Sequence, residues 1–99
     1  MQFMVLGYDG TDPEAPQRRL AVRPRHLEIS AHLKAQGRQL YGAALLDDAG
    51  EMVGSLMVYD FPSRADLDAA LEAEPYITGK VWQRVEIQPC RVAPAFLNG

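Results

Sequence analysis

Residues 20–37, LAVRPRHLEISAHLKAQG, read as a helix that places a histidine on an apolar face. At about 100° per residue, one stripe within about 60° collects Val22, His26, Ile29 and Leu33. A second, roughly opposite strip holds Leu20, Leu27 and Ala31, which predicts that both sides of this helix are covered. An imidazole in such a stripe is either a core histidine bonded to backbone or part of a site with a partner group elsewhere in the chain.

Proline and glycine residues indicate where this helix begins and ends. Pro24 predicts either a kink near Arg23 or a main helix that begins at Pro24, because an interior proline removes a hydrogen bond. Residues 14–17, which contain Pro16, are expected to form a loop or the lead into the helix. Gly37 is expected to end the helix in the left-handed conformation.

Four further stretches read as strands, namely residues 2–8, 39–46, 52–60 and 81–87. The turn-rich residues 47–51 predict a hairpin between the middle two. In the last strand Val85 and Trp82 are expected on opposite faces, with Trp82 as packing or dimer surface, and Pro89 is expected to end it. Residues 91–99 read as a tail that hangs loose or docks on a neighbour.

A second helix follows the third strand. Ser63 and Asp66 form a capping-box-like pair at its start, and Pro75 is expected to stop it at Glu74, with a loop over residues 76–80. The resulting order, β-α-β-β-α-β, predicts an α+β ferredoxin-like sandwich with a four-stranded antiparallel sheet and both helices on one face. The apolar character of the strands predicts a homodimer in which sheets face each other, from Met4, Leu6, Tyr41, Leu45, Met57 and Tyr59.

Length and composition restrict the function classes. The 99 residues are 47% hydrophobic and 23% charged, as expected for one globular domain spanning residues 1–99. A net charge of −3 with no basic block argues against a nucleic-acid partner, and the lack of a long apolar run argues against a membrane span or signal peptide. Cys90 is the only cysteine and reads as structural, so no internal disulfide is expected and the cytoplasm is the expected compartment. His26 and His32 lack metal-pair spacing, and no metal site is expected.

Glu74 is the candidate partner for His26. A carboxylate in the last turn of a helix meets the negative end of the helix dipole, so the protonated form or a neighbouring cation would be favoured there. A nearby imidazolium would supply that cation, although a solvated acid is the alternative interpretation.

Several motifs resemble the YCII-related, or YciI-like, family along nearly the whole chain. They are RLAVRPRHL at residues 19–27, GS at 54–55, EPY with a later glycine at 74–79, and VEIQP at 85–89. The resemblance implies a dimeric α+β barrel with a pocket around His26, which would work with the aspartate of a D-P-Y motif. This chain has Glu74 at that position, one methylene longer, which can shift the carboxylate by about 1 Å.

Other residues are expected to contribute to this pocket, and two of them, Ser55 and Tyr76, match the family pattern. Ser55 and Tyr76 would supply hydroxyl groups to a ligand or to the histidine. Arg23 would hold an anionic group or remain a solvated arginine, and Gly42 and Gly54 would keep the pocket open.

Two functional hypotheses follow. The first is a cofactor-independent enzyme in which His26 acts as general acid and base with Glu74 setting its charge and tautomer. The resemblance implies lyase- or isomerase-like chemistry on a small oxygenated molecule, with aromatic compounds among the candidates. The alternative is a ligand-binding, accessory or assembly domain without turnover, because a fold does not fix a function.

Overall fold

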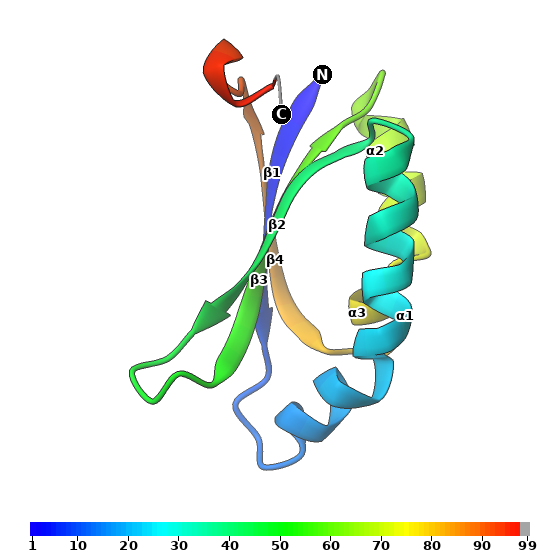
Figure 1. Cartoon of the computed structure of the whole chain (residues 1–99). Helices are drawn as coiled ribbons and strands as arrows, with labels where there is room; N and C mark the ends of the chain where they lie inside the picture. The colour runs from blue at the N-terminus through cyan, green and yellow to red at the C-terminus, as the bar shows by residue number, and fades with distance from the viewer. Residues whose placement is uncertain (98–99) are drawn as a thin grey trace.

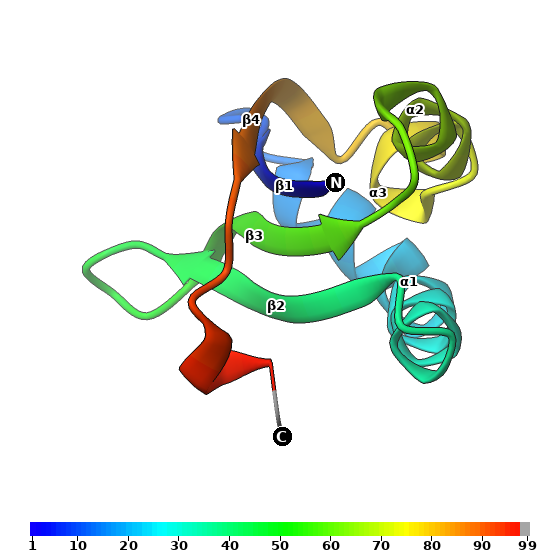
Figure 2. The ribbon, with the colours of Figure 1, turned by 90° about the horizontal axis from the view of Figure 1, so that it is seen from above.

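The architecture is a four-stranded antiparallel sheet with every α-helix on one face (Figures 1 and 2). A computed structural model describes residues 1–97, and the sheet order is β2-β3-β1-β4. The elements are β1 (Gln2–Asp9), α1 (Ala15–Ala35), β2 (Gln39–Leu46), β3 (Met52–Asp60), α2 (Arg64–Glu72), α3 (Pro75–Thr78), β4 (Trp82–Cys90) and a 3-10 turn η1 (Pro94–Phe96). The predicted α+β, ferredoxin-like fold is therefore confirmed.

Helix α1 begins earlier than expected. It starts at Ala15 with Pro16 in its first turn, so residues 14–17 lead into the helix, which is the second of the two alternatives expected for them. A proline there loses no intrahelical bond, which explains why the helix tolerates it. Pro24 lies inside α1, and Figure 1 shows the helix bending in its first half. Gly37 has φ 73°, and the amide of Arg38 donates to the carbonyl of Leu33 at 2.8 Å, which closes the helix as predicted.

The core lies between the sheet and the helices. Its fully buried members include Phe3 and Val5 of β1, Tyr59 of β3 and Leu67 of α2. Met57 and Tyr59 are in this core, so their assignment to the outer sheet face was wrong. Strand alternation gives the reason, since β3 pairs Tyr59 with Phe3 and Met57 with Val5 on the helix side.

The opposite sheet face carries apolar side chains that no α-helix covers. Met4 and Leu6 alternate with the buried residues of β1 and are half-buried, while Tyr41 of β2 is 61% exposed. The turn η1 lies on this side of the sheet in Figure 1. Pairing of two such faces remains a prediction of the apolar pattern.

Strand β4 departs from its predicted faces at a bulge. The register with β1 shifts between Tyr8 and Asp9, so Trp82 lies on the same side of the sheet as Val85. Trp82 is 6% exposed there and belongs to the core, whereas Val85 is 38% exposed. A Cβ at Gly7 would lie 2.2 Å from the indole ring, and glycine is therefore required there. Pro89 does not end β4, because an edge strand tolerates a residue without an amide hydrogen.

The end of the chain is tied to β1 by one bond. The amide of Val92 donates to the side chain of Gln2 at 2.6 Å, and residues 94–96 form η1. Asn98 and Gly99, the end of the expected tail, lie outside the described residues.

Candidate functional site

His26 and Glu74 lie in direct contact beneath the sheet. The imidazole Nδ1 is 2.5 Å from a carboxylate oxygen of Glu74, and both residues are at most 4% exposed. The ring of Tyr76 stacks on the imidazole with centroids 3.9 Å apart and planes 18° apart. The contact orients Nδ1 toward the acid, and Nε2 forms no hydrogen bond within residues 1–97.

Local sequence explains how Glu74 is held. Pro75 disfavours the helical conformation at the preceding residue, and Glu74 is extended with φ −70° and ψ 123°. It caps α3, where its side chain accepts the amide hydrogen of Tyr76 at 3.2 Å. The loop predicted over residues 76–80 was therefore wrong, because residues 75–78 form α3.

The electrostatic reason given for Glu74 was also wrong. Helix α2 ends at Glu72, and Glu74 stands at the start of the next helix rather than in a last turn. In that position its side chain accepts the amide hydrogen of Tyr76 and contacts the imidazole nitrogen of His26.

A buried ion pair adjoins this contact. Arg19 donates from Nη1 to both carboxylate oxygens of Asp9, at 2.9 and 3.1 Å, and from Nη2 to the hydroxyl of Ser55 at 2.8 Å. Its guanidinium also lies 4.5 Å from the ring centroid of Tyr76. The indole Nε1 of Trp82 donates to the same Ser55 oxygen at 3.2 Å, so this hydroxyl accepts twice.

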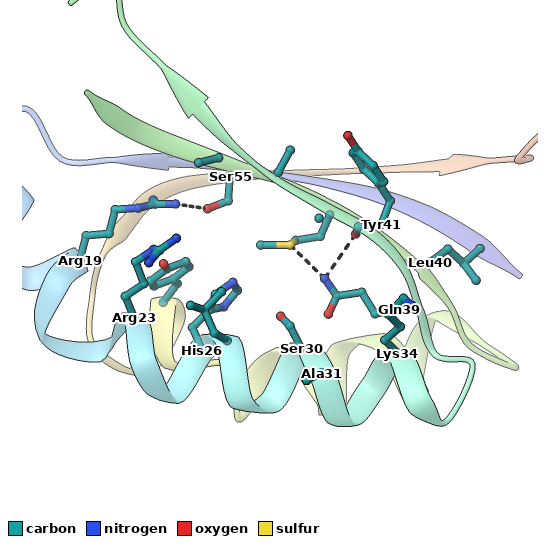
Figure 3. A pocket seen from close by; sticks show the side chains of 16 residues that line it. Arg19, Arg23, His26, Ser30, Ala31, Lys34, Gln39, Leu40, Tyr41 and Ser55 are labelled. Carbon is teal, nitrogen blue, oxygen red and sulfur yellow. Dashed lines mark hydrogen bonds between the residues drawn. The ribbon is translucent and has the colours of Figure 1, made fainter. Parts of the chain in front are cut away.

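Four of these residues, Arg19, His26, Ser55 and Tyr76, line a cavity of about 440 Å³ between α1 and the sheet, a volume typical of small-molecule sites. Figure 3 shows Arg19, Arg23 and His26 projecting from α1 toward Ser55 on the sheet. Gly42 also lines the cavity, where a Cβ would come within 2.9 Å of the Gln39 amide.

Gly54 has a different place from the one expected. It does not line the cavity, and a Cβ there would lie 2.6 Å from the carbonyl oxygen of Gly7. Glycine at this position therefore permits the close approach of β1 and β3. Residues 54 and 55 lie on opposite faces of β3, so Ser55 faces the cavity and Gly54 does not.

Burial perturbs the ionisable groups around the cavity. Desolvation raises the pKa of Asp9 above its ordinary value, although the guanidinium of Arg19 acts in the opposite direction. Desolvation likewise raises the pKa of Tyr76, so its hydroxyl stays protonated at neutral pH. Tyr76 presents its ring rather than its hydroxyl to His26, and a hydroxyl offered to a ligand stays a prediction.

Sequence reasoning missed Asp9, Arg19 and the buried role of Trp82. A signal for Arg19 was present, because positions 19, 23, 26 and 30 follow helical spacing and line the same cavity. Asp9 gave no such signal, since its turn-rich surroundings looked like an ordinary strand end. The burial of Trp82 depends on the bulge in the pairing of β4 with β1, which the sequence pattern of β4 does not indicate.

No group of three or more potential metal ligands gathers anywhere in residues 1–97. Within the same residues, no helix has the length and apolar character needed to cross a membrane.

The fold and the site geometry define a class of protein. It is a ferredoxin-like α+β domain with a buried histidine–carboxylate contact beside a cavity of small-molecule size. The chain belongs to the YCII-related domain family, whose model matches residues 1–91. It is 28% identical over 95 residues to the protein YciI of Escherichia coli O6:H1, covering 90% of this chain and 95% of that protein. The YciI protein of Shigella flexneri gives the same identity and coverage.

Solved structures share the fold at lower sequence identity. The 5-chloro-2-hydroxyhydroquinone dehydrochlorinase TftG of Burkholderia phenoliruptrix AC1100, in complex with 2,5-dihydroxybenzoquinone, matches with a TM-score of 0.80 and 20% identity. That match covers 96% of this chain and 98% of TftG. SnoaB, a cofactor-independent oxygenase of Streptomyces nogalater, matches with a TM-score of 0.51 and 11% identity over 94% of each chain. At these identities the likeness concerns the fold alone.

Proposed function

We propose that this protein is a cofactor-independent acid–base enzyme that moves a proton on a small oxygenated molecule. The observation that carries the proposal is the contact between His26 Nδ1 and Glu74 beside the cavity. With Nδ1–H donating to the carboxylate, Nε2 holds the lone pair of the neutral ring and can accept a substrate proton. Glu74 then stabilises the imidazolium that forms.

The surrounding residues support this assignment. Tyr76 fixes the plane of the imidazole by stacking, and Ser55 offers a hydroxyl held from two sides by Arg19 and Trp82. Arg23 lines the cavity and can bind an anionic oxygen of the substrate. Such charge stabilisation lowers the barrier to proton abstraction next to a carbonyl group. Two proteins of the same fold are a dehydrochlorinase bound to a dihydroxybenzoquinone and a cofactor-independent oxygenase, so the fold accommodates this kind of chemistry.

The test is hydrogen exchange into a panel of hydroxyquinones and dicarbonyl compounds, followed by NMR in deuterium oxide. The wild-type protein should accelerate exchange, and His26→Gln should abolish it while the fold survives. Removing a general base typically costs about 10²–10⁴ in rate. His32→Gln is the matched control, because His32 is an exposed histidine on the same helix. Retained exchange in His26→Gln would refute the mechanism, and ligand binding without any exchange would favour the accessory-domain alternative.

We also propose that two copies pair through their outer sheet faces. Met4 and Leu6 lie on this face in the central strand β1, and no α-helix covers them. Light scattering should give a dimer at micromolar concentration, and Leu6→Glu should shift it toward monomer. A wild-type monomer at that concentration would contradict the pairing.

A further inference from the structure

The two ends of the cavity differ in chemistry. At the end near His26, Arg23 forms no ion pair and no hydrogen bond with residues 1–97, although it lines the cavity. Arg19 beside it is already neutralised by Asp9. Ser55 accepts from Arg19 and Trp82, so its own hydroxyl proton is left to donate to a further acceptor. Among residues 1–97, no carboxylate side chain lines the cavity.

An unpaired guanidinium and a free hydroxyl donor together suit an anionic oxygen. A carboxylate or phenolate oxygen at this end would receive charge-assisted hydrogen bonds from both groups. A neutral group would leave the cation of Arg23 without a counter-charge.

The opposite end offers a buried acceptor without a partner. Gln39 is 6% exposed, and its amide nitrogen donates to the carbonyl of Tyr41 at 3.3 Å and contacts the sulfur of Met57 at 3.3 Å. A carbonyl oxygen can receive only from the amide nitrogen, so these contacts fix the orientation of the side-chain amide. Its Oε1 is therefore the atom left buried with no hydrogen bond among the described residues.

Ser30 lies on α1 at the same end. Its hydroxyl oxygen is also buried and forms no hydrogen bond within residues 1–97. Figure 3 shows Ser30 and Gln39 reaching into the cavity from the helix and from the start of β2. A ligand hydroxyl here could donate to Gln39 Oε1 and accept from the Ser30 hydroxyl, which would satisfy both buried groups.

We infer that the cavity takes a small anion with a hydroxyl group at its opposite end, such as an aromatic hydroxy acid. The anionic oxygen binds at Arg23 and Ser55, and the hydroxyl binds between Ser30 and Gln39. Arg23 and Ser30 are seven positions apart, about 10 Å along α1, a distance that one substituted ring with a hydrogen bond at each end can bridge. The inference names the substrate class of the site, so it rests on the proposed function.

The test compares binding of three probes by isothermal titration calorimetry. The probe para-hydroxybenzoate carries both groups, benzoate lacks the hydroxyl, and para-cresol lacks the anion. The wild-type protein should prefer para-hydroxybenzoate over each of the other two by roughly tenfold or more. Equal affinities for the three probes, or no binding of para-hydroxybenzoate at millimolar concentration, would overturn the inference.

Substitutions assign each preference to one end. Arg23→Gln should remove the advantage over para-cresol, and Ser30→Ala or Gln39→Leu should remove the advantage over benzoate. Ser30→Ala is the safer variant, since Gln39 also supports the backbone of β2. Arg25→Gln is the matched control, because Arg25 is an exposed arginine on the same helix.

The outcome is separable from that of the proposed function. Selective binding without hydrogen exchange would remove the acid–base role and leave the ligand class intact. Preferences that persist in Arg23→Gln and Ser30→Ala would refute the ligand class whatever the activity.

Discussion

The buried pair of Asp9 and Arg19 permits a prediction in which the two single substitutions behave differently with pH. Their side chains are 4% and 3% exposed, and Arg19 cannot become neutral when its partner is lost. Breaking a buried pair from one side costs about 3–5 kcal/mol. We expect Asp9→Asn to cost about 3 kcal/mol, the lower end, because Arg19 borders the cavity and water there would screen its charge.

Arg19→Met should behave differently, because the carboxyl left behind can take up a proton. Burial already raises the pKa of Asp9 above 3.8, and loss of the guanidinium would raise it further. A carboxyl with a raised pKa binds its proton more tightly in the folded state, so stability falls as pH rises from 3.8 through the folded-state pKa. Lowering the pH from neutral should therefore restore stability to Arg19→Met relative to wild type, and should not restore it to Asp9→Asn.

The assay is urea unfolding followed by the fluorescence of Trp82, the single tryptophan. With a slope of about 1.5 kcal/mol/M, Asp9→Asn should lower the midpoint by about 2 M. The double variant Asp9→Asn/Arg19→Met should be more stable than the sum of the single losses predicts, because no charge remains unpaired. Asp12→Asn, which breaks the exposed pair with Arg18, is the control and should change little. Additive losses, or an Arg19→Met variant that does not recover in acid, would refute the reasoning.

Two further predictions concern packing and alkaline pH. Gly7→Ala should destabilise the protein by about 3 kcal/mol in urea unfolding, because its Cβ would enter the ring of Trp82 and β1 cannot shift freely. Gly42→Ala is the control and should cost less, because its Cβ meets only flexible side chains. Equal losses in the two variants would count against the bulge geometry. Burial raises the pKa of Tyr59 and of Tyr76 above 10, so the free energy of unfolding should fall as pH rises beyond about 10. Replacing either tyrosine with phenylalanine should weaken this pH dependence. An unchanged dependence of the unfolding free energy on pH in both variants would argue against their burial.

Much of the fold was predictable because local patterns and the topology agree. The hairpin of β2 and β3 has the predicted bounds, Gly37 closes α1, and Ser63 caps α2 through the amide of Asp66. These features depend on turn and cap chemistry that a short stretch of sequence contains.

The misplaced features depend on contacts between distant segments. The bulge that turns Trp82 into the core arises from its register with β1, and no pattern within β4 reveals it. Helix α3 has only a single turn, which propensity cannot distinguish from a loop.

Only part of the candidate site could be predicted from the sequence. His26 stood out on the apolar stripe, and the family resemblance supplied Glu74, although the helix-end argument for that acid was wrong. Asp9 and Gln39 come from strand ends distant in sequence, so only the folded chain shows that Asp9 pairs with Arg19 and that Gln39 lines the same cavity as Ser30.

The most direct measurement for the central claim is the tautomer of His26, read from its ring nitrogen shifts by ¹⁵N NMR at mildly alkaline pH. The chain has two histidines, so His32→Gln completes the assignment. The account predicts a neutral ring with its proton on Nδ1, donated to Glu74, and a free lone pair on Nε2. A proton on Nε2 under these conditions would contradict the account, because no base would then be available to a molecule in the cavity.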